Sequence, residues 1–219
     1  MFFFIQLLAT DPLAYLVALA ALAFSLVLHN IAQASLASAF GDGTARLRGF
    51  TSTEPRLHLD TFYLLWLAVF GFAIPTQIPL NSYAFSKQGP REALVWWSGP
   101  LAMIVWAFVL VTTAVLLSRF GGVALEGVAN GLSQGAIRVL SLGVVFLFPV
   151  PPLPGARAVF AIGSQQVRGW LRDLEGWMAR SPFSFMLIFV VLSVLGITGA
   201  LSSFFFRIFL AILSAVGLA

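Results

Sequence analysis

The side chains with the greatest chemical potential in this 219-residue chain lie in two short stretches of its first third. An apolar run near the N-terminus carries His29, Asn30 and Gln33, and a later loop carries His58 and Asp60. Imidazole and carboxylate groups can bind metal ions or move protons. Polar groups inside a membrane helix are costly, which makes them functional candidates by default. His29 and Gln33 are four residues apart, so they lie one turn apart on one face of a helix.

A third candidate segment is the proline-rich run from Phe146 to Arg157. The residue before a proline leaves the α region, so this run is expected to end an apolar helix and continue as extended chain. No phosphate-binding glycine loop accompanies these segments, and both histidines lie far from any serine-elbow pattern. Metal binding or plain hydrogen bonding is therefore the chemistry to consider.

The composition indicates that lipid is the main solvent of the elements that position these residues. Hydrophobic residues make up 60% of the chain and charged residues 9%, and the mean hydropathy is +0.98. A soluble domain has about 25% charged residues. We therefore predict an all-α, polytopic membrane helix bundle of about four to six transmembrane segments, in the bacterial inner membrane and in contact with lipid. The net charge of +4 comes from arginines dispersed between apolar runs, so nucleic acid is not an expected partner.

Five apolar regions are the predicted membrane elements. The first follows Asp11-Pro12, a good start for a helix, and the third begins at Gly99-Pro100. We predict a break of the fifth region in two, at Gly196, Gly199 and Arg207. The five regions span residues 13–40, 62–74, 96–118, 137–148 and 183–218.

The second region is too short to cross comfortably, and the basic residues predict its path. If it dips into the membrane and returns, the basic residues divide unequally between the two faces, as the positive-inside rule requires. If it crosses, the bias disappears. The re-entrant path is therefore predicted. One face then holds Arg46, Arg48, Arg56, Lys87, Arg91, Arg157, Arg168, Arg172 and Arg180, and the other holds Arg119 and Arg138.

Residues 166–180 have a different pattern, with apolar side chains at helical spacing and charged ones opposite. Trp170 and Trp177 on the apolar side predict an amphipathic helix at the membrane surface. No linker divides the chain, so we expect a single integral membrane domain over 1–219. Its parts are a core at 13–155, the interfacial helix at 166–180 and C-terminal membrane helices at 183–218.

Four motifs in order resemble the site-2 protease family of intramembrane zinc metalloproteases, in its compact bacterial form. The family's H-E-x-x-H resembles 29–33, its G-P-L-A-N resembles 98–103, and its N-L-x-P-x-P-P-L-D-G resembles 146–155. His58-Leu59-Asp60 and the stretch 75–81 resemble the family's H-I-D-P and proline-rich connection. The resemblance implies the family's fold, with membrane-associated strands between the metal helix and the next full span.

The departures from the family pattern concern its chemistry. The resemblance makes His29 the first zinc ligand, but Asn30 replaces the general base and Gln33 the second ligand. Pro154 replaces the third ligand, which is an aspartate in the family. A catalytic zinc needs three protein ligands and a water. We therefore expect His29, Asn30, Gln33 and Pro154 to be degenerate positions of a non-catalytic member, with no cofactor.

Two hypotheses follow. The first is a pseudoprotease that binds a transmembrane or peptide client or modulates a partner, with the polar cluster tying helices together. Met103 and Phe146 replace two asparagines that line the family's substrate site, and candidate peptide-binding residues are Met103, Phe146, Pro151, Pro152, Leu153 and Gly155. The alternative is an active intramembrane metallopeptidase whose unconventional zinc site uses His29, His58 and Asp60.

Overall fold

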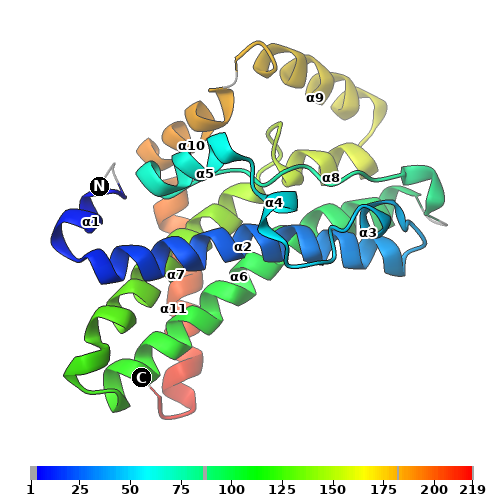
Figure 1. The fold of residues 1–219 in the computed structure, drawn as a ribbon. Coiled ribbons are helices and arrows are strands. Elements are labelled where there is room, and N and C mark those ends of the chain that lie inside the picture. Colours follow the sequence, from blue (N-terminus) through cyan, green and yellow to red (C-terminus); the bar gives the residue numbers. More distant parts are fainter. Residues whose placement is uncertain (1–3, 86–87, 182, 219) are drawn as a thin grey trace.

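A computed structural model describes residues 4–85, 88–181 and 183–218 (Figure 1). Lys87, which the charge count assigned to the arginine-rich face, lies outside the described residues. All regular structure in the described residues is helical. The α-helices are α1 Gln6–Thr10, α2 Pro12–Ala39, α3 Thr44–Leu47, α4 Pro55–His58, α5 Thr61–Phe70, α6 Gln88–Phe120, α7 Glu126–Phe146, α8 Pro154–Ile162, α9 Gln165–Met178, α10 Ser184–Val194 and α11 Ile197–Ala215, and the 3-10 helices are η1 Ser82–Ala84 and η2 Val123–Leu125.

Four helical stretches within the described residues are long and apolar enough to cross a membrane. They are α2, α6, the stretch Val123–Phe146 that contains α7, and α11. With 28 residues, α2 is roughly 42 Å long, which exceeds the ~30 Å hydrocarbon core of a bilayer. The prediction of a polytopic helical membrane protein is confirmed, and the chain is an integral membrane protein.

The centre of the bundle is formed by α2, α6 and α7, which cross one another in Figure 1. Small residues allow α2 and α7 to approach closely. A Cβ atom added at Gly131 of α7 would lie 2.8 Å from the carbonyl oxygen of Ala14 and 2.6 Å from the Cβ of Val17. Close packing of small residues is the usual basis of helix association in lipid. Gly131 therefore sets the distance between two spanning helices.

The second apolar region folds as a re-entrant excursion. It leaves from His58, runs through α5, and returns along an extended segment to Thr76, whose N–H donates to the His58 carbonyl at 2.8 Å. The tip of α5 is held by Tyr15, whose hydroxyl donates to the Ala68 carbonyl at 3.0 Å. The two ends of the excursion thus meet, as the charge distribution predicts. The strands that the resemblance implied here are wrong for the described residues, where this segment is extended without strand pairing.

Helix boundaries follow local chemistry where the sequence marks them clearly. Asp11 precedes α2 and its Oδ1 accepts from the Ala14 N–H at 2.9 Å, which confirms the predicted start. The predicted start of the third region was wrong, because α6 begins at Gln88 and continues through Pro100. The fourth region also begins earlier than predicted, since α7 starts at Glu126 and its first turns are polar.

The C-terminal region divides in two, as predicted. The break lies between α10 and α11, where Gly196 has a left-handed backbone conformation. The predicted breaks at Gly199 and Arg207 were wrong, since both residues lie inside α11. The exposed residues of α11 are mainly apolar, which suits contact with lipid.

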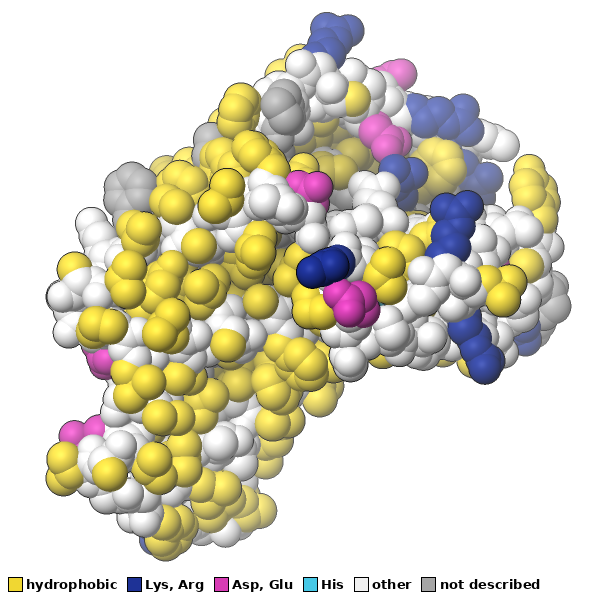
Figure 2. Space-filling view, in the orientation of Figure 1, with side chains coloured by type: hydrophobic (Ala, Val, Ile, Leu, Met, Phe, Trp, Pro, Cys, Tyr) yellow, Lys and Arg dark blue, Asp and Glu magenta, His cyan; other side chains and the backbone are white. Residues whose placement is uncertain are grey.

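The charged side chains gather at one end of the molecule. Figure 2 shows the Arg side chains mainly over the end that carries α3, α8 and α9, whereas hydrophobic side chains predominate over the rest of this face. Arg46, Arg48 and Arg172 are exposed at the charged end. The unequal division of basic residues along the sequence therefore corresponds to one arginine-rich end of the folded protein.

Helix α9 coincides with the amphipathic segment found in the sequence. Its Leu171 and Met178 are buried, whereas Trp170 and Trp177 are more than half exposed. In Figure 1 it lies apart from the crossing helices, joined to them through α8 and α10. Its position at a membrane surface stays a prediction.

We expect Gly131→Ala to destabilise the bundle, because the new methyl group would meet backbone atoms of α2 that cannot move aside freely. Overpacking of this kind costs about 1–3 kcal/mol. Gly199→Ala is the matched control, since a Cβ there meets nothing within 4 Å. Thermal unfolding of the detergent-purified protein should show a lower midpoint only for Gly131→Ala. Equal midpoints for the two variants would contradict the close contact of α2 and α7.

Candidate functional site

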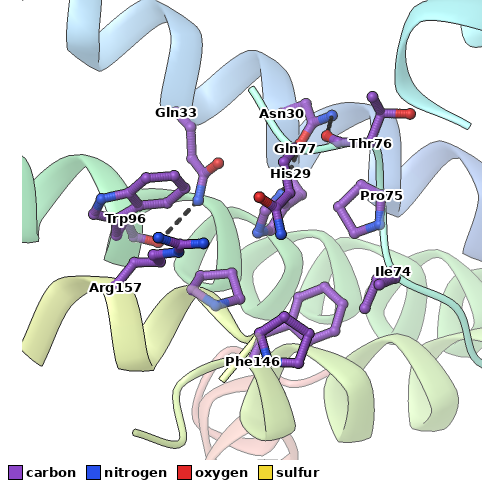
Figure 3. A pocket seen from close by; sticks show the side chains of 12 residues that line it. His29, Asn30, Gln33, Ile74, Pro75, Thr76, Gln77, Trp96, Phe146 and Arg157 are labelled. Atoms are coloured by element: carbon purple, nitrogen blue, oxygen red, sulfur yellow. Dashed lines mark hydrogen bonds between the residues drawn. The ribbon is translucent and has the colours of Figure 1, made fainter. Parts of the chain in front are cut away.

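A pocket opens where α2, α6, the end of α7, the start of α8 and the extended return segment meet (Figure 3). It contains about 400 Å³ of atom-free space, including its opening. Its position along α2 places it about 9–15 Å from the C-terminal end of that helix. The lining residues are His29, Asn30, Gln33, Ile74, Pro75, Thr76, Gln77, Trp96, Phe146, Pro152, Pro154 and Arg157.

Asn30 connects the α2 face of the pocket to the return segment. Its Nδ2 donates to the Thr76 carbonyl at 2.8 Å, which leaves its Oδ1 as an acceptor for His29 Nδ1 at 3.0 Å. The amide oxygen cannot donate, so His29 carries its proton on Nδ1 and presents an unprotonated Nε2. Nε2 is buried and has no hydrogen-bond partner. His29 thus contributes a buried acceptor without a partner to this part of the protein.

Gln33 compensates for a proline inside α6. Pro100 has no N–H, so it cannot bond to the carbonyl of Trp96 four residues earlier. The Gln33 side chain crosses from α2 and its Nε2 donates to that carbonyl at 3.0 Å (Figure 3). A backbone carbonyl without a partner in the membrane costs several kcal/mol. Gln33 therefore has a definite role in joining α2 to α6.

The residue before Pro100 makes room for His29. A Cβ atom at Gly99 would lie 2.5 Å from His29 Nε2 and Cδ2, so only glycine permits the ring to occupy its position. On another side the His29 ring meets Phe146 edge to face, with centroids 5.4 Å apart. The ring is fixed between α6 and α7, which gives its free Nε2 a fixed direction.

The four degenerate positions lie together at the pocket, but the candidate peptide-binding residues divide. His29, Asn30, Gln33 and Pro154 all line the pocket, and so do Phe146 and Pro152. Pro151 lines two neighbouring hollows instead. Three candidates are buried and absent from the lining, because they pack inside the protein: Met103, Leu153 and Gly155.

His58 and Asp60 have structural partners outside the pocket. His58 is fully buried, its Nε2 lies 2.9 Å from the Ser52 carbonyl, and its ring meets Phe50 edge to face. Asp60 begins α5 by accepting from the Phe62 N–H at 2.8 Å. Neither lines the pocket with His29. The described residues include no group of three or more His, Cys, Asp or Glu side chains that could hold a metal ion.

Sequence reasoning missed several lining residues, of which Arg157 is the most consequential. It lies in the first turn of α8, three residues after Pro154, so helical spacing could have placed it beside that position. Its guanidinium NH2 pairs with Glu175 Oε1 of α9 at 2.7 Å. Trp96 and Gln77 were also missed: Gln77 lies in the stretch 75–81 that resembles the family's proline-rich connection, but neither residue was proposed as a site residue.

Comparison with curated proteins gives one match from Bacillus subtilis (strain 168), named "Putative zinc metalloprotease YwhC". The two chains are 32% identical over 157 residues, which is 70% of this chain and 72% of the relative. No family model matches the chain, and no solved structure does.

The name of this relative corrects one expectation. We expected no cofactor, whereas the relative's name associates it with zinc. The pocket residues do not fit a catalytic zinc, which takes three protein ligands. His29 offers one imidazole nitrogen, the two amide N–H groups are bound to backbone carbonyls, and Pro154 has no donor atom. No chemical step is therefore assigned to a metal here.

The role of Gln33 predicts an energetic coupling to Pro100. Gln33→Leu should lower the free energy of unfolding by about 1–3 kcal/mol, because the Trp96 carbonyl loses its partner. In a Pro100→Ala background the cost should be smaller, since residue 100 then has an N–H for that carbonyl. Chemical unfolding in detergent of the four proteins in this double-mutant cycle measures the coupling. An unchanged cost would show that Gln33 acts through other contacts.

His58 predicts an acid-sensitive loop. Burial lowers the pKa of its imidazole below the ordinary value, and the hydrogen bond to Ser52 only partly opposes this. The neutral ring therefore adds stability above the unfolded-state pKa of about 6.5, and this is lost as pH falls through the folded-state pKa. The unfolding midpoint should fall between about pH 7.5 and about pH 5, and fall less in His58→Gln. Equal pH dependence in the two proteins would exclude His58 as a source.

Proposed function

Because the chain belongs to the metalloprotease-like family of YwhC, we propose that it is a site-2-protease-like membrane protein that binds a peptide without cleaving it. The bound group is an extended stretch of a transmembrane or membrane-adjacent client, held at the pocket beside His29. The family membership supports a protease-like framework. The finer statement rests on the pocket itself.

The hydrogen bonding of the two amides carries this proposal. A general base in zinc-dependent hydrolysis needs a side chain that accepts a proton near neutral pH. Asn30 cannot do so, and its Nδ2 is bound to Thr76. No carboxylate lies among the twelve lining residues. Asn30 and Gln33, which occupy positions that resemble a catalytic motif, act here as hydrogen-bond donors to backbone carbonyls.

The pocket has features that suit an extended peptide. His29 Nε2 is a buried acceptor without a partner, and a peptide N–H would satisfy it. Apolar walls from Phe146, Pro152 and Ile74 surround it. A peptide bound there would exchange its contact with water for a hydrogen bond and apolar contacts, which is the usual composition of a ligand site.

We place the protein in the bacterial inner membrane with its arginine-rich end in the cytoplasm. The grouping of Arg side chains at one end supports this orientation through the positive-inside rule. The pocket then opens toward the cytoplasmic half of the membrane, because it lies nearer the C-terminal end of α2, which Arg46 and Arg48 follow.

Site-specific photo-crosslinking tests the binding. A photoreactive residue replaces Gln77, which lines the pocket and is exposed, and the same residue at Leu47, which is 89% exposed on α3, is the control. The probe is a labelled synthetic peptide with one apolar span of about 20 residues and polar flanks. We expect crosslinking well above the control at position 77, with the probe recovered at full length.

Two outcomes would overturn the proposal. Equal crosslinking at positions 77 and 47 would show that the pocket binds no such peptide. Cleavage of the probe, with bound zinc that is lost in His29→Ala, would establish the alternative of an active metallopeptidase. That alternative needs His58 and Asp60 at the metal, and the structure gives both residues other partners.

A reconstruction tests the positional match on which the resemblance depends. The triple variant Asn30→Glu, Gln33→His and Pro154→Asp restores the missing base and ligands around one pocket. We expect a folded triple variant to bind zinc more tightly than the Gln33→His single variant. Equal zinc binding by the two folded proteins would contradict the match.

A further inference from the structure

The pocket contains one permanently charged side chain, and it is a cation. Arg157 is the only charged residue among the twelve that line the pocket. Figure 3 shows its guanidinium beside Trp96, on the Gln33 side of the pocket. A guanidinium disfavours a metal ion and favours a carboxylate, to which it can donate two parallel hydrogen bonds. The pocket is therefore lined by a hydrogen-bond donor, the Arg157 guanidinium, and by His29, whose Nε2 is an acceptor without a partner.

Arg157 already holds a carboxylate that comes from another element. Glu175 of α9 lies 2.7 Å from its NH2 through Oε1. Both side chains are accessible to water, with 38% and 42% of their surfaces exposed. Exposed ion pairs of this kind contribute little to stability, typically less than about 1 kcal/mol. Glu175 can therefore be exchanged for another carboxylate at small cost.

The ion pair stands at the junction of several hollows. Arg157 borders the pocket of His29 and an adjoining hollow that Glu175 also lines. Glu175 borders a further hollow that continues past Pro151 and Pro152 toward Ser184. The three hollows therefore adjoin one another through lining residues that they share in pairs. Glu175 lines two of these hollows, and its partner Arg157 lines the pocket of His29.

We propose that Arg157 selects peptides that carry a carboxylate, and that Glu175 occupies this place until such a peptide binds. This proposal rests on the proposed function, whose peptide it specifies. The peptide carboxylate, from an acidic side chain or from a free C-terminus, replaces Glu175 on Arg157. A backbone N–H of the same peptide donates to His29 Nε2, and α9 loses its ionic link to α8.

Binding of matched peptides tests the selectivity. The probes are the apolar-span peptide with a single flanking glutamate and amidated C-terminus, the same peptide with glutamine, and the glutamine peptide with a free C-terminal carboxylate. Affinity is measured by fluorescence anisotropy in detergent. We expect the wild type to bind at least one carboxylate peptide about tenfold more tightly than the neutral one. The stronger of the two identifies the source of the carboxylate.

Variants of the ion pair give opposite expectations. Arg157→Gln should abolish the preference for a carboxylate, whereas Glu175→Gln should raise the affinity for the carboxylate peptide several-fold, because the competitor is removed. Arg180→Gln, which removes a cation from the end of α9 outside the pocket, is the control and should keep the preference. A purely structural ion pair would make both variants change affinity in the same direction.

The outcomes distinguish a failure of the carboxylate selectivity from a failure of the proposed peptide binding. Equal binding of all three peptides by the wild type, with crosslinking retained at position 77, would overturn the carboxylate selectivity and leave peptide binding intact. Preference retained in Arg157→Gln would also overturn it. Failure of every peptide to crosslink at position 77 would instead overturn the proposed function.

Discussion

Backbone carbonyls inside a membrane need a protein partner, because the hydrocarbon offers none. The pocket depends on two side-chain amides that meet this requirement. The Asn30 amide donates to the Thr76 carbonyl of the return segment. The Gln33 amide donates to the Trp96 carbonyl, which has no intrahelical partner because Pro100 lacks an N–H. Through these two bonds α2 holds both the re-entrant excursion and α6. The arrangement of His29 follows, since its Nδ1 is fixed by the same Asn30.

This constraint gives the departures from the family motif a physical meaning. An ionised glutamate at position 30 could not donate to the Thr76 carbonyl, as the Asn30 amide does. The two amides therefore have a structural role, because they donate hydrogen bonds to backbone carbonyls. The relative's name associates it with zinc. A metalloprotease-like relative and a chain that bonds carbonyls at these positions can share one framework.

The sequence predicts those parts of the fold that are marked by a local motif or by the distribution of charge along the whole chain. Asp11-Pro12 marks the start of α2 locally, and the basic residues indicate globally that the second region returns to its side of entry. The long α6 could not be predicted, because a proline such as Pro100 normally ends a helix. Gln33, which donates to the Trp96 carbonyl that Pro100 leaves open, lies 63 residues before Trp96 in the sequence. Glu175 near Arg157 was equally hidden, since only the turn between α8 and α9 brings them together.

The two anchors of the excursion lie on one helix. Tyr15 bonds to the end of α5 and Asn30 bonds to the extended return segment. The two residues are fifteen positions apart on α2. That separation is about four helical turns, so both side chains project from nearly the same side. One inserted residue between them would rotate Asn30 and the adjacent His29 by about 100° relative to Tyr15. The two anchors would then no longer lie on the same face of α2. Evolution can thus exchange the identities of site residues here, but the helical phase of α2 must be kept.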